Sequence, residues 1–178
     1  IKCDWSSDVC SFRSSLHPSI QIKWPNDLWV DGQKLAGILI ETAAIQVQGS
    51  LSNEPNHRYA VIGVGINLDA PKSATWQAAT DGKATPTGLR QLMPSVTREA
   101  ALERILEPLI DTIQNFEQHG YRPYAVSFAK RDALQGLSIK VSSGMTGKYL
   151  GVSEQGALRI ETSAGVQTII SHEVSVCL

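Results

Sequence analysis

The alternation of apolar and polar residues near the start of the chain predicts a β-hairpin. Residues 20–24 alternate strictly between the two kinds of residue. Pro25-Asn26-Asp27 then interrupts the run, because proline removes a backbone donor and Asn and Asp tolerate turn dihedrals. After residues 28–30, the dipeptide Asp31-Gly32 is typical of a two-residue hairpin turn, whose central residues need positive φ. A second strand should therefore follow at once.

The register of this hairpin decides which side chains share a face. A two-residue loop pairs Val30 with Gln33 and Trp29 with Lys34. Strict alternation along the second strand then predicts a face formed by Lys34, Ala36, Ile38 and Ile40. The lysine is the one charge on this otherwise apolar surface.

Two interpretations of this charged strand stay open on spacing alone. A single lysine is most often a solvated edge residue whose stem lies on a neighbouring ring. Gly37 weakens the strand unless a bulge or a closely approaching ligand requires it, and a ligand beside Lys34 would explain it. Asn26 and Asp27 are equally consistent with a local Asx-type turn and with a ligand contact. If the region is a site, Lys23 and Lys34 suit it to an anion.

Two longer strands are predicted next. Residues 38–44 and 59–68 read as neighbouring strands joined by a polar connection at 48–58. Residues 69–96 are rich in Ala, Thr, Pro and Gly, and they read as a mobile connection with one helical turn near residues 89–93. The predicted core of this part of the chain is therefore a sheet.

A glycine-rich segment in the second of these strands has more than one interpretation. Gly63 and Gly65 could suggest a dinucleotide-binding loop, but Leu68 stands where a third glycine is needed and no helix pattern follows. On a strand, Gly63, Gly65 and Asn67 share a face and leave a shallow floor for a flat ligand. Close packing against a helix would explain the glycines equally well.

A long amphipathic helix is predicted from Thr97, as N-cap, to Gly120. Glu99 favours its first turn, and Gly120 can end it. Apolar residues recur at three- and four-residue steps and predict a core-facing stripe of Leu102, Ile105, Leu106, Leu109, Ile110, Ile113 and Phe116. Pro108 falls inside this helix and predicts a kink or a break there. A shorter helix should run from Pro123 to about residue 133.

The last part of the chain changes character. Residues 137–141, 146–152, 157–162 and 166–171 are short alternating runs separated by Ser-Gly, Gln-Gly and Ala-Gly pairs. That spacing predicts a small antiparallel barrel or sandwich over residues 134–178.

Composition excludes several classes of function. The 178 residues carry a formal net charge of −1, so a basic footprint for nucleic acid is missing. No apolar run approaches the roughly 18 residues that span a bilayer, and no signal peptide is evident, so we expect a cytoplasmic protein that does not bind membranes. Cys3, Cys10 and Cys177 are too scattered for a disulfide framework, and neither they nor the four histidines have zinc-site spacing. No metal site is predicted.

Two motifs resemble those of a known family. Residues 23–41, beginning Lys-Trp-Pro-Asn-Asp-Leu, resemble the signature of biotin protein ligases, and residues 59–68 resemble the family's second strand motif. The resemblance covers about residues 16–178. It implies an α/β (α+β) fold of the class II synthetase-like biotin/lipoate ligase type, a mixed sheet with flanking helices. It also implies that residues 16–133 belong to the catalytic domain and residues 134–178 to an SH3-like β-barrel.

The resemblance also implies a reaction and a site. These enzymes use ATP and Mg²⁺ to form biotinyl-5'-AMP, and they transfer biotin to a lysine of a biotin carboxyl carrier domain; some form homodimers. Lys34 would be the catalytic cation. The residues implied for biotin are Lys34, Gly37, Leu39, Gly63 and Gly65, and those implied for ATP are Lys23, Asn26, Asp27 and Asn67. A lipoate-type ligase or acyltransferase and a non-catalytic binding fragment stay open as alternatives, and a repressor would need a helix-turn-helix that this sequence lacks.

The first fifteen residues do not fit this pattern. Residues 1–15 show neither helical nor strand periodicity, although the family would place an amphipathic helix just before residue 23. Our hypothesis is that this leader is foreign and that the natural protein begins further upstream. The family's glycine- and arginine-rich ligand loop, which belongs upstream, does not occur in the sequence. The chain thus resembles the C-terminal part of a ligase.

Overall fold

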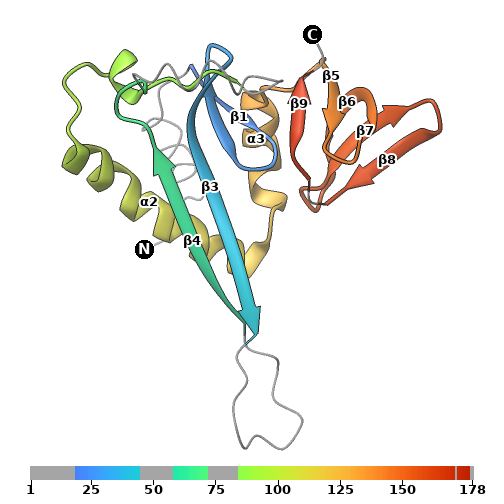
Figure 1. Ribbon diagram of the computed structural model, residues 1–178. Helices are drawn as coiled ribbons and strands as arrows, with labels where there is room; N and C mark the ends of the chain where they lie inside the picture. Colours follow the sequence, from blue (N-terminus) through green and yellow to red (C-terminus); the bar gives the residue numbers. More distant parts are fainter. Residues whose placement is uncertain (1–18, 45–57, 72–83, 171, 177–178) are drawn as a thin grey trace, which may run out of the picture.

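Two antiparallel sheets organise the chain (Figure 1). The computed structural model describes residues 19–44, 58–71, 84–170 and 172–176. The leader at residues 1–15, nearly all of the connection at 48–58, all three cysteines, His17 and His57 therefore lie outside the described residues. Within the described part, no helix is long and apolar enough to cross a membrane.

The first sheet is built from the predicted hairpin and the two longer strands. Its strands are β1 (Ile20–Lys23), β2 (Asp27–Val30), β3 (Gln33–Ala44) and β4 (Arg58–Ile66), in that order across the sheet. Each neighbouring pair is antiparallel. In Figure 1, β3 and β4 form a long ribbon that extends beyond the two short strands. The prediction that these two strands are neighbours is confirmed.

The hairpin turn between β2 and β3 has the predicted geometry. Asp31 and Gly32 have φ angles of 50° and 74°, as this turn requires. Val30 pairs with Gln33 and Trp29 pairs with Lys34, so the predicted register at the turn is confirmed. At the other end of β2, the peptide bond between Trp24 and Pro25 is cis.

The predicted face of β3 is wrong, because the strand contains a bulge. Trp29 lies opposite Lys34 but Leu28 lies opposite Ala36, so Leu35 is an extra residue. A bulge of this kind shifts the alternation by one residue. The Lys34 side chain consequently shares a face with Gly37, while Leu35 and Ala36 are both buried, at 2% and 3% exposure.

The first hydrophobic core lies under this bulge. It contains Ile20, Val30, Leu35, Ala36, Leu89, Val96 and Ala101. The predicted helical turn is the 3₁₀ helix η2 (Leu89–Gln91). The described part of the predicted mobile connection is bound to β3, since Lys34 N donates to Thr85 O at 2.8 Å and Thr87 N donates to Lys34 O at 2.8 Å.

The long helix α2 (Arg98–His119) has the predicted ends. Thr97 is the N-cap, and its hydroxyl accepts a hydrogen bond from Ala100 N at 3.1 Å, while Gly120 ends the helix with φ of 65°. The prediction at Pro108 was a kink or a break; the helix continues through Pro108, so there is no break. Its apolar stripe is not core-facing among the described residues: Leu102 is 59% exposed and Phe116 52%. Periodicity predicts such a stripe but cannot say which residues cover it.

A short helix and a second sheet complete the fold. The 3₁₀ helix η3 (Arg122–Tyr124) and α3 (Ala125–Arg131) occupy the predicted helical segment. The second sheet consists of β5 (Ser138–Val141), β6 (Thr146–Val152), β7 (Leu158–Thr162), β8 (Gly165–Ile169) and β9 (Val174–Val176), in the order β8-β7-β6-β5-β9. All its pairings are antiparallel, as predicted. The three-residue β9 was not predicted.

Candidate functional site

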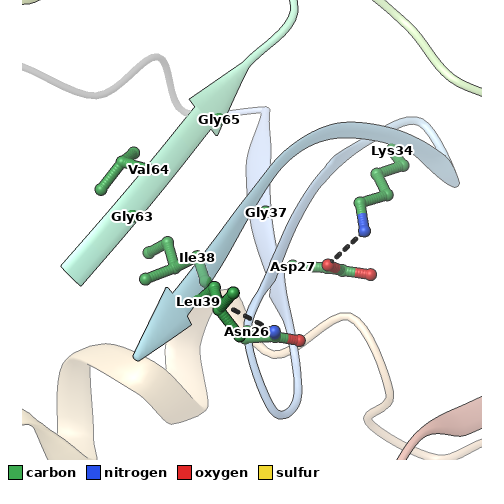
Figure 2. A pocket seen from close by; sticks show the side chains of 9 residues that line it. All are labelled: Asn26, Asp27, Lys34, Gly37, Ile38, Leu39, Gly63, Val64 and Gly65. Atoms are coloured by element: carbon green, nitrogen blue, oxygen red, sulfur yellow. Dashed lines mark hydrogen bonds and ion pairs between the residues drawn. The ribbon is translucent and has the colours of Figure 1, made fainter. Parts of the chain in front are cut away.

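An open depression of about 450 Å³ lies on the face of the first sheet that carries Lys34 (Figure 2). It is lined by Asn26, Asp27, Lys34, Gly37, Ile38, Leu39, Gly63, Val64 and Gly65. These residues come from the β1–β2 corner, the bulged start of β3 and the end of β4. Three segments that are separate in the sequence thus meet at one place.

The floor of the depression contains three glycines, two of which lie opposite each other. Gly37 lies opposite Gly65, and Leu39 lies opposite Gly63. A Cβ atom added to Gly63 would come no closer than 3.8 Å to another residue, and one added to Gly65 no closer than 3.9 Å. Packing among the described residues therefore does not require Gly63 or Gly65, and these residues leave space above the two glycines for a ligand.

The charge of the site is concentrated on one carboxylate and two ammonium groups. Lys34 Nζ lies 2.6 Å from Asp27 Oδ1, and Lys23 Nζ lies 3.9 Å from Asp27 Oδ2. The Lys34 side chain is 40% exposed, whereas those of Lys23 and Asp27 are 13% and 14% exposed. Two cations thus outnumber one anion, and the more accessible cation faces the depression.

The half-buried Lys23 has a lowered pKa. Burial lowers the pKa of Lys23, and the charge of Lys34 acts in the same direction, while Asp27 opposes both. Lys23 Nζ also lies 5.3 Å from the centroid of the Trp29 ring, a distance at which a cation is attracted to the ring face. An anion bound nearby would favour the charged form of this lysine.

Asn26 is fixed to β3 rather than closed on itself in a local turn. Its Nδ2 donates to Ile38 O at 2.7 Å, and Ile38 N donates back to Asn26 O at 2.9 Å. Figure 2 shows this amide and the Asp27–Lys34 pair side by side along the strand. The two hydrogen bonds hold the corner between β1 and β2 against the floor.

The structure brings most of the predicted site residues together. Seven of them line the depression, and Lys23 adjoins it through Asp27. Asn67 is not among the lining residues; its Nδ2 donates to Lys34 O at 3.5 Å, behind the lysine. Sequence reasoning missed Ile38 and Val64, which pair across β3 and β4 between the glycine positions. Their place beside Gly37 and between Gly63 and Gly65 was the signal that could have identified them.

Among the described residues, no group of three or more His, Cys, Asp and Glu side chains could hold a metal ion. Asp27 is the carboxylate that lines the depression, and both its oxygens face lysines.

The sequence is similar to those of known proteins. Residues 14–67 match the sequence model of the Biotin/lipoate A/B protein ligase family, a span that includes every residue lining the depression. The chain is 26% identical over 159 residues to the bifunctional ligase/repressor BirA of Bacillus subtilis, covering 87% of this chain and 46% of that protein. It is 27% identical to the biotin--[acetyl-CoA-carboxylase] ligase of Paracoccus denitrificans, covering 87% of this chain and 62% of the relative.

A similar fold is found in solved structures. The biotin protein ligase from Aquifex aeolicus in complex with biotin and ATP has a TM-score of 0.67 at 23% identity, and the match covers 89% of this chain and 62% of that one. The chain spans about half the length of the curated relatives it matches first. The chain is thus similar to biotin protein ligases in sequence over most of its length, and it shares their fold.

Proposed function

We propose that the depression binds biotin and ATP, and that the protein activates biotin as biotinyl-5'-AMP before transferring it to a lysine of a biotin carboxyl carrier domain. The observation that carries this proposal is an accessible ammonium group, that of Lys34, at the edge of a floor made of glycines. A flat ligand with an anionic end fits such a surface. The names of the relatives, which include ligases for acetyl-CoA carboxylase, support the choice of biotin.

Lys34 has an electrostatic role in this proposal. The biotin carboxylate attacks the α-phosphorus of ATP, the bond to the bridging oxygen breaks, and pyrophosphate leaves. An ammonium between carboxylate and phosphate offsets the negative charge that accumulates, and it needs no proton transfer. At a separation of about 4 Å and an effective dielectric constant of about 20, one such attraction amounts to about 4 kcal/mol before solvent screening.

Asp27 holds the Lys34 side chain in position before a ligand binds. Its Oδ1 atom holds Lys34 Nζ at 2.6 Å, so the ammonium already points over the face that carries Gly37. The Lys34 side chain is 40% exposed, so an incoming anion can compete with Asp27 for it. Less conformational freedom then has to be lost when the ligand binds.

The remaining residues divide between the two substrates. Gly37, Leu39, Gly63 and Gly65 would contact biotin, with the 60% exposed Leu39 side chain as an apolar wall. Lys23, Asn26 and Asp27 would order the phosphates, and Asn67 would contact adenine. Mg²⁺ would arrive with ATP, and Asp27 is the carboxylate that could meet it there.

The proposal also covers the domains, the acceptor, the cellular compartment and the oligomeric state. Residues 16–133 would form part of the catalytic domain, and residues 134–178 an SH3-like module beside it. The leader at residues 1–15 would be foreign to both. The acceptor would be a biotin carboxyl carrier domain, the reaction would take place in the cytoplasm, and a homodimer would be compatible with it.

ATP–pyrophosphate exchange tests this proposal. We expect exchange that depends on biotin and is not supported by lipoate. The Lys34→Ala variant should lose most of it. Lys130→Ala is the matched control, because Lys130 is an exposed lysine on α3, away from the depression. Exchange supported by lipoate instead would assign the chain to the lipoate-type ligases, and the absence of exchange with either acid would contradict the proposal.

A further inference from the structure

We propose that Trp24 is a positioning residue, whose indole ties the β1–β2 corner to the second sheet and thereby holds Asn26 and Asp27 in place. The second sheet would then shape the depression although none of its described residues lines it. The inference rests on the proposed function only for what the depression binds. The tether itself depends only on the contacts that Trp24 makes within the chain.

Trp24 is packed in the core of the other sheet. It follows β1 directly, yet it is 4% exposed within a cluster that contains Leu134, Ile139, Val141, Tyr149, Leu158, Ile160, Ile169 and Val174. Its Nε1 atom donates to Gly156 O at 3.0 Å, across 132 positions of sequence. Because this core is formed by the second sheet, the indole joins the two sheets at the end of β1.

The acceptor of this hydrogen bond is itself held firmly. Gly156 N donates to Ser153 O at 2.9 Å, and Ser153 N donates to Ala157 O at 2.7 Å, closing the turn between β6 and β7. Gly156 has φ of 81°, and a Cβ atom there would lie 3.4 Å from the Tyr121 ring. The Gly156 carbonyl therefore has little freedom to follow the indole.

A second attachment holds β1 to the segment that follows α3. Ala133 N donates to Ile22 O at 2.9 Å, and Arg131 Nη1 donates to Ile20 O at 2.9 Å. The segment that makes these bonds is anchored by the buried Asp132, which accepts from Tyr149 Oη at 2.6 Å and from Leu134 N at 3.0 Å. β1 is thus attached to the C-terminal part of the chain at Ile20 and Ile22, in addition to the contact of Trp24 just beyond its end.

Displacement of Trp24 would be transmitted to the site over a very short distance. Pro25 alone separates it from Asn26, which exchanges two hydrogen bonds with Ile38. Asp27, which holds the Lys34 ammonium, comes next. Because a displacement of about 1 Å can cost about 10² in rate at an active site, a loosened corner should weaken ligand binding and catalysis.

Trp24→Phe tests the tether, with Trp29→Phe as the matched control. Both variants remove an indole N–H from the same hairpin, but Trp29 Nε1 is buried without a hydrogen-bond partner among the described residues. We would measure amide hydrogen exchange at Ile38, which donates to Asn26, and at Asn67, which donates to Leu35 in the same sheet. The affinity for biotinyl-adenylate would be measured on the same samples.

We expect Trp24→Phe to accelerate exchange at Ile38 and to weaken the adenylate affinity, each about fivefold, the equivalent of one hydrogen bond. Exchange at Asn67 should stay unchanged, and Trp29→Phe should have the smaller effect on Ile38. Equal acceleration at Ile38 and Asn67 would indicate general loosening and overturn the proposal, as would an unchanged affinity. If Trp24→Phe does not fold, Tyr149→Phe, which removes the hydroxyl bound to Asp132, should give the same selective pattern.

A failure of the proposed function would be recognised separately. If the wild-type chain does not bind biotinyl-adenylate, the assignment of the ligand is wrong. The amide hydrogen-exchange rates of Ile38 and Asn67 would then still decide whether Trp24 fixes the corner between β1 and β2.

Discussion

Replacing Gly65 by alanine should make the protein more stable and its ligand affinity weaker. Gly65 lies near the end of β4, opposite Gly37, and it is not one of the glycines with positive φ. The added methyl group would point over the floor of the depression, where the nearest atom of another residue, Gly37 O, is 3.9 Å away. The fold has room for the methyl group, but a ligand resting on the floor does not.

The two effects differ in sign and can be estimated separately. A Gly→Ala substitution at an unstrained position stabilises a protein by about 0.4–1 kcal/mol, because the unfolded chain loses freedom. A methyl group forced into a close contact costs about 1–3 kcal/mol, which corresponds to a loss of affinity of roughly 5- to 150-fold. If Gly65 served packing alone, the change would affect stability and leave affinity alone.

Urea denaturation and calorimetric titration with biotinyl-adenylate measure the two quantities. Gly147→Ala is the contrasting variant, since its added methyl group would collide with the carbonyl of Glu161 in the second sheet, and it should lower stability. An adenylate affinity of Gly65→Ala equal to that of the wild type would refute the role of the glycine floor. A marked loss of stability in Gly65→Ala would instead refute the inference that the fold has room for the added methyl group.

Three further predictions concern charge, pH and helix ends. Lys34→Ala should slow adenylation in an ATP–pyrophosphate exchange assay about 10²- to 10³-fold. A rate near that of the wild type would show that Lys34 has no role in catalysis. Burial raises the pKa of Asp132, so its contribution to stability should be greatest below about pH 4 and be lost as pH rises through the folded-state pKa. Asp132→Asn should therefore gain stability relative to wild type as the pH rises above about 4 in urea titrations, and a constant difference would contradict this. Thr97→Ala, which removes the α2 cap, should cost about 1 kcal/mol in the same titrations, whereas no change would mean the cap is dispensable.

Local chemistry made much of this fold predictable. Asp31-Gly32 indicated the turn and the register beside it, and Thr97 and Gly120 marked the ends of α2. These features depend on a few neighbouring residues, so a single sequence contains the information. The residues of the glycine floor could be named for the same reason, since their alternation along a strand is local.

Features that depend on distant contacts could not be predicted in the same way. The bulge at Leu35 reversed the face of Lys34, and two adjacent apolar residues, Leu35 and Ala36, were its only local trace. Alternation placed Trp24 with the other apolar residues of β1, whereas its side chain enters the core of the second sheet. The stripe on α2 was predicted to face the core, but Leu102 and Phe116 are exposed among the described residues, because burial depends on what lies opposite the helix.

Isothermal titration of the chain with biotinyl-adenylate tests the central claim most directly, because it reports on the depression without requiring turnover. We predict saturable binding at one site, weakened in Lys34→Ala and retained in Lys130→Ala. Binding that is equally tight in the wild type and Lys34→Ala would contradict the assignment of the ammonium group. The absence of binding to the wild type would contradict the proposed function as a whole.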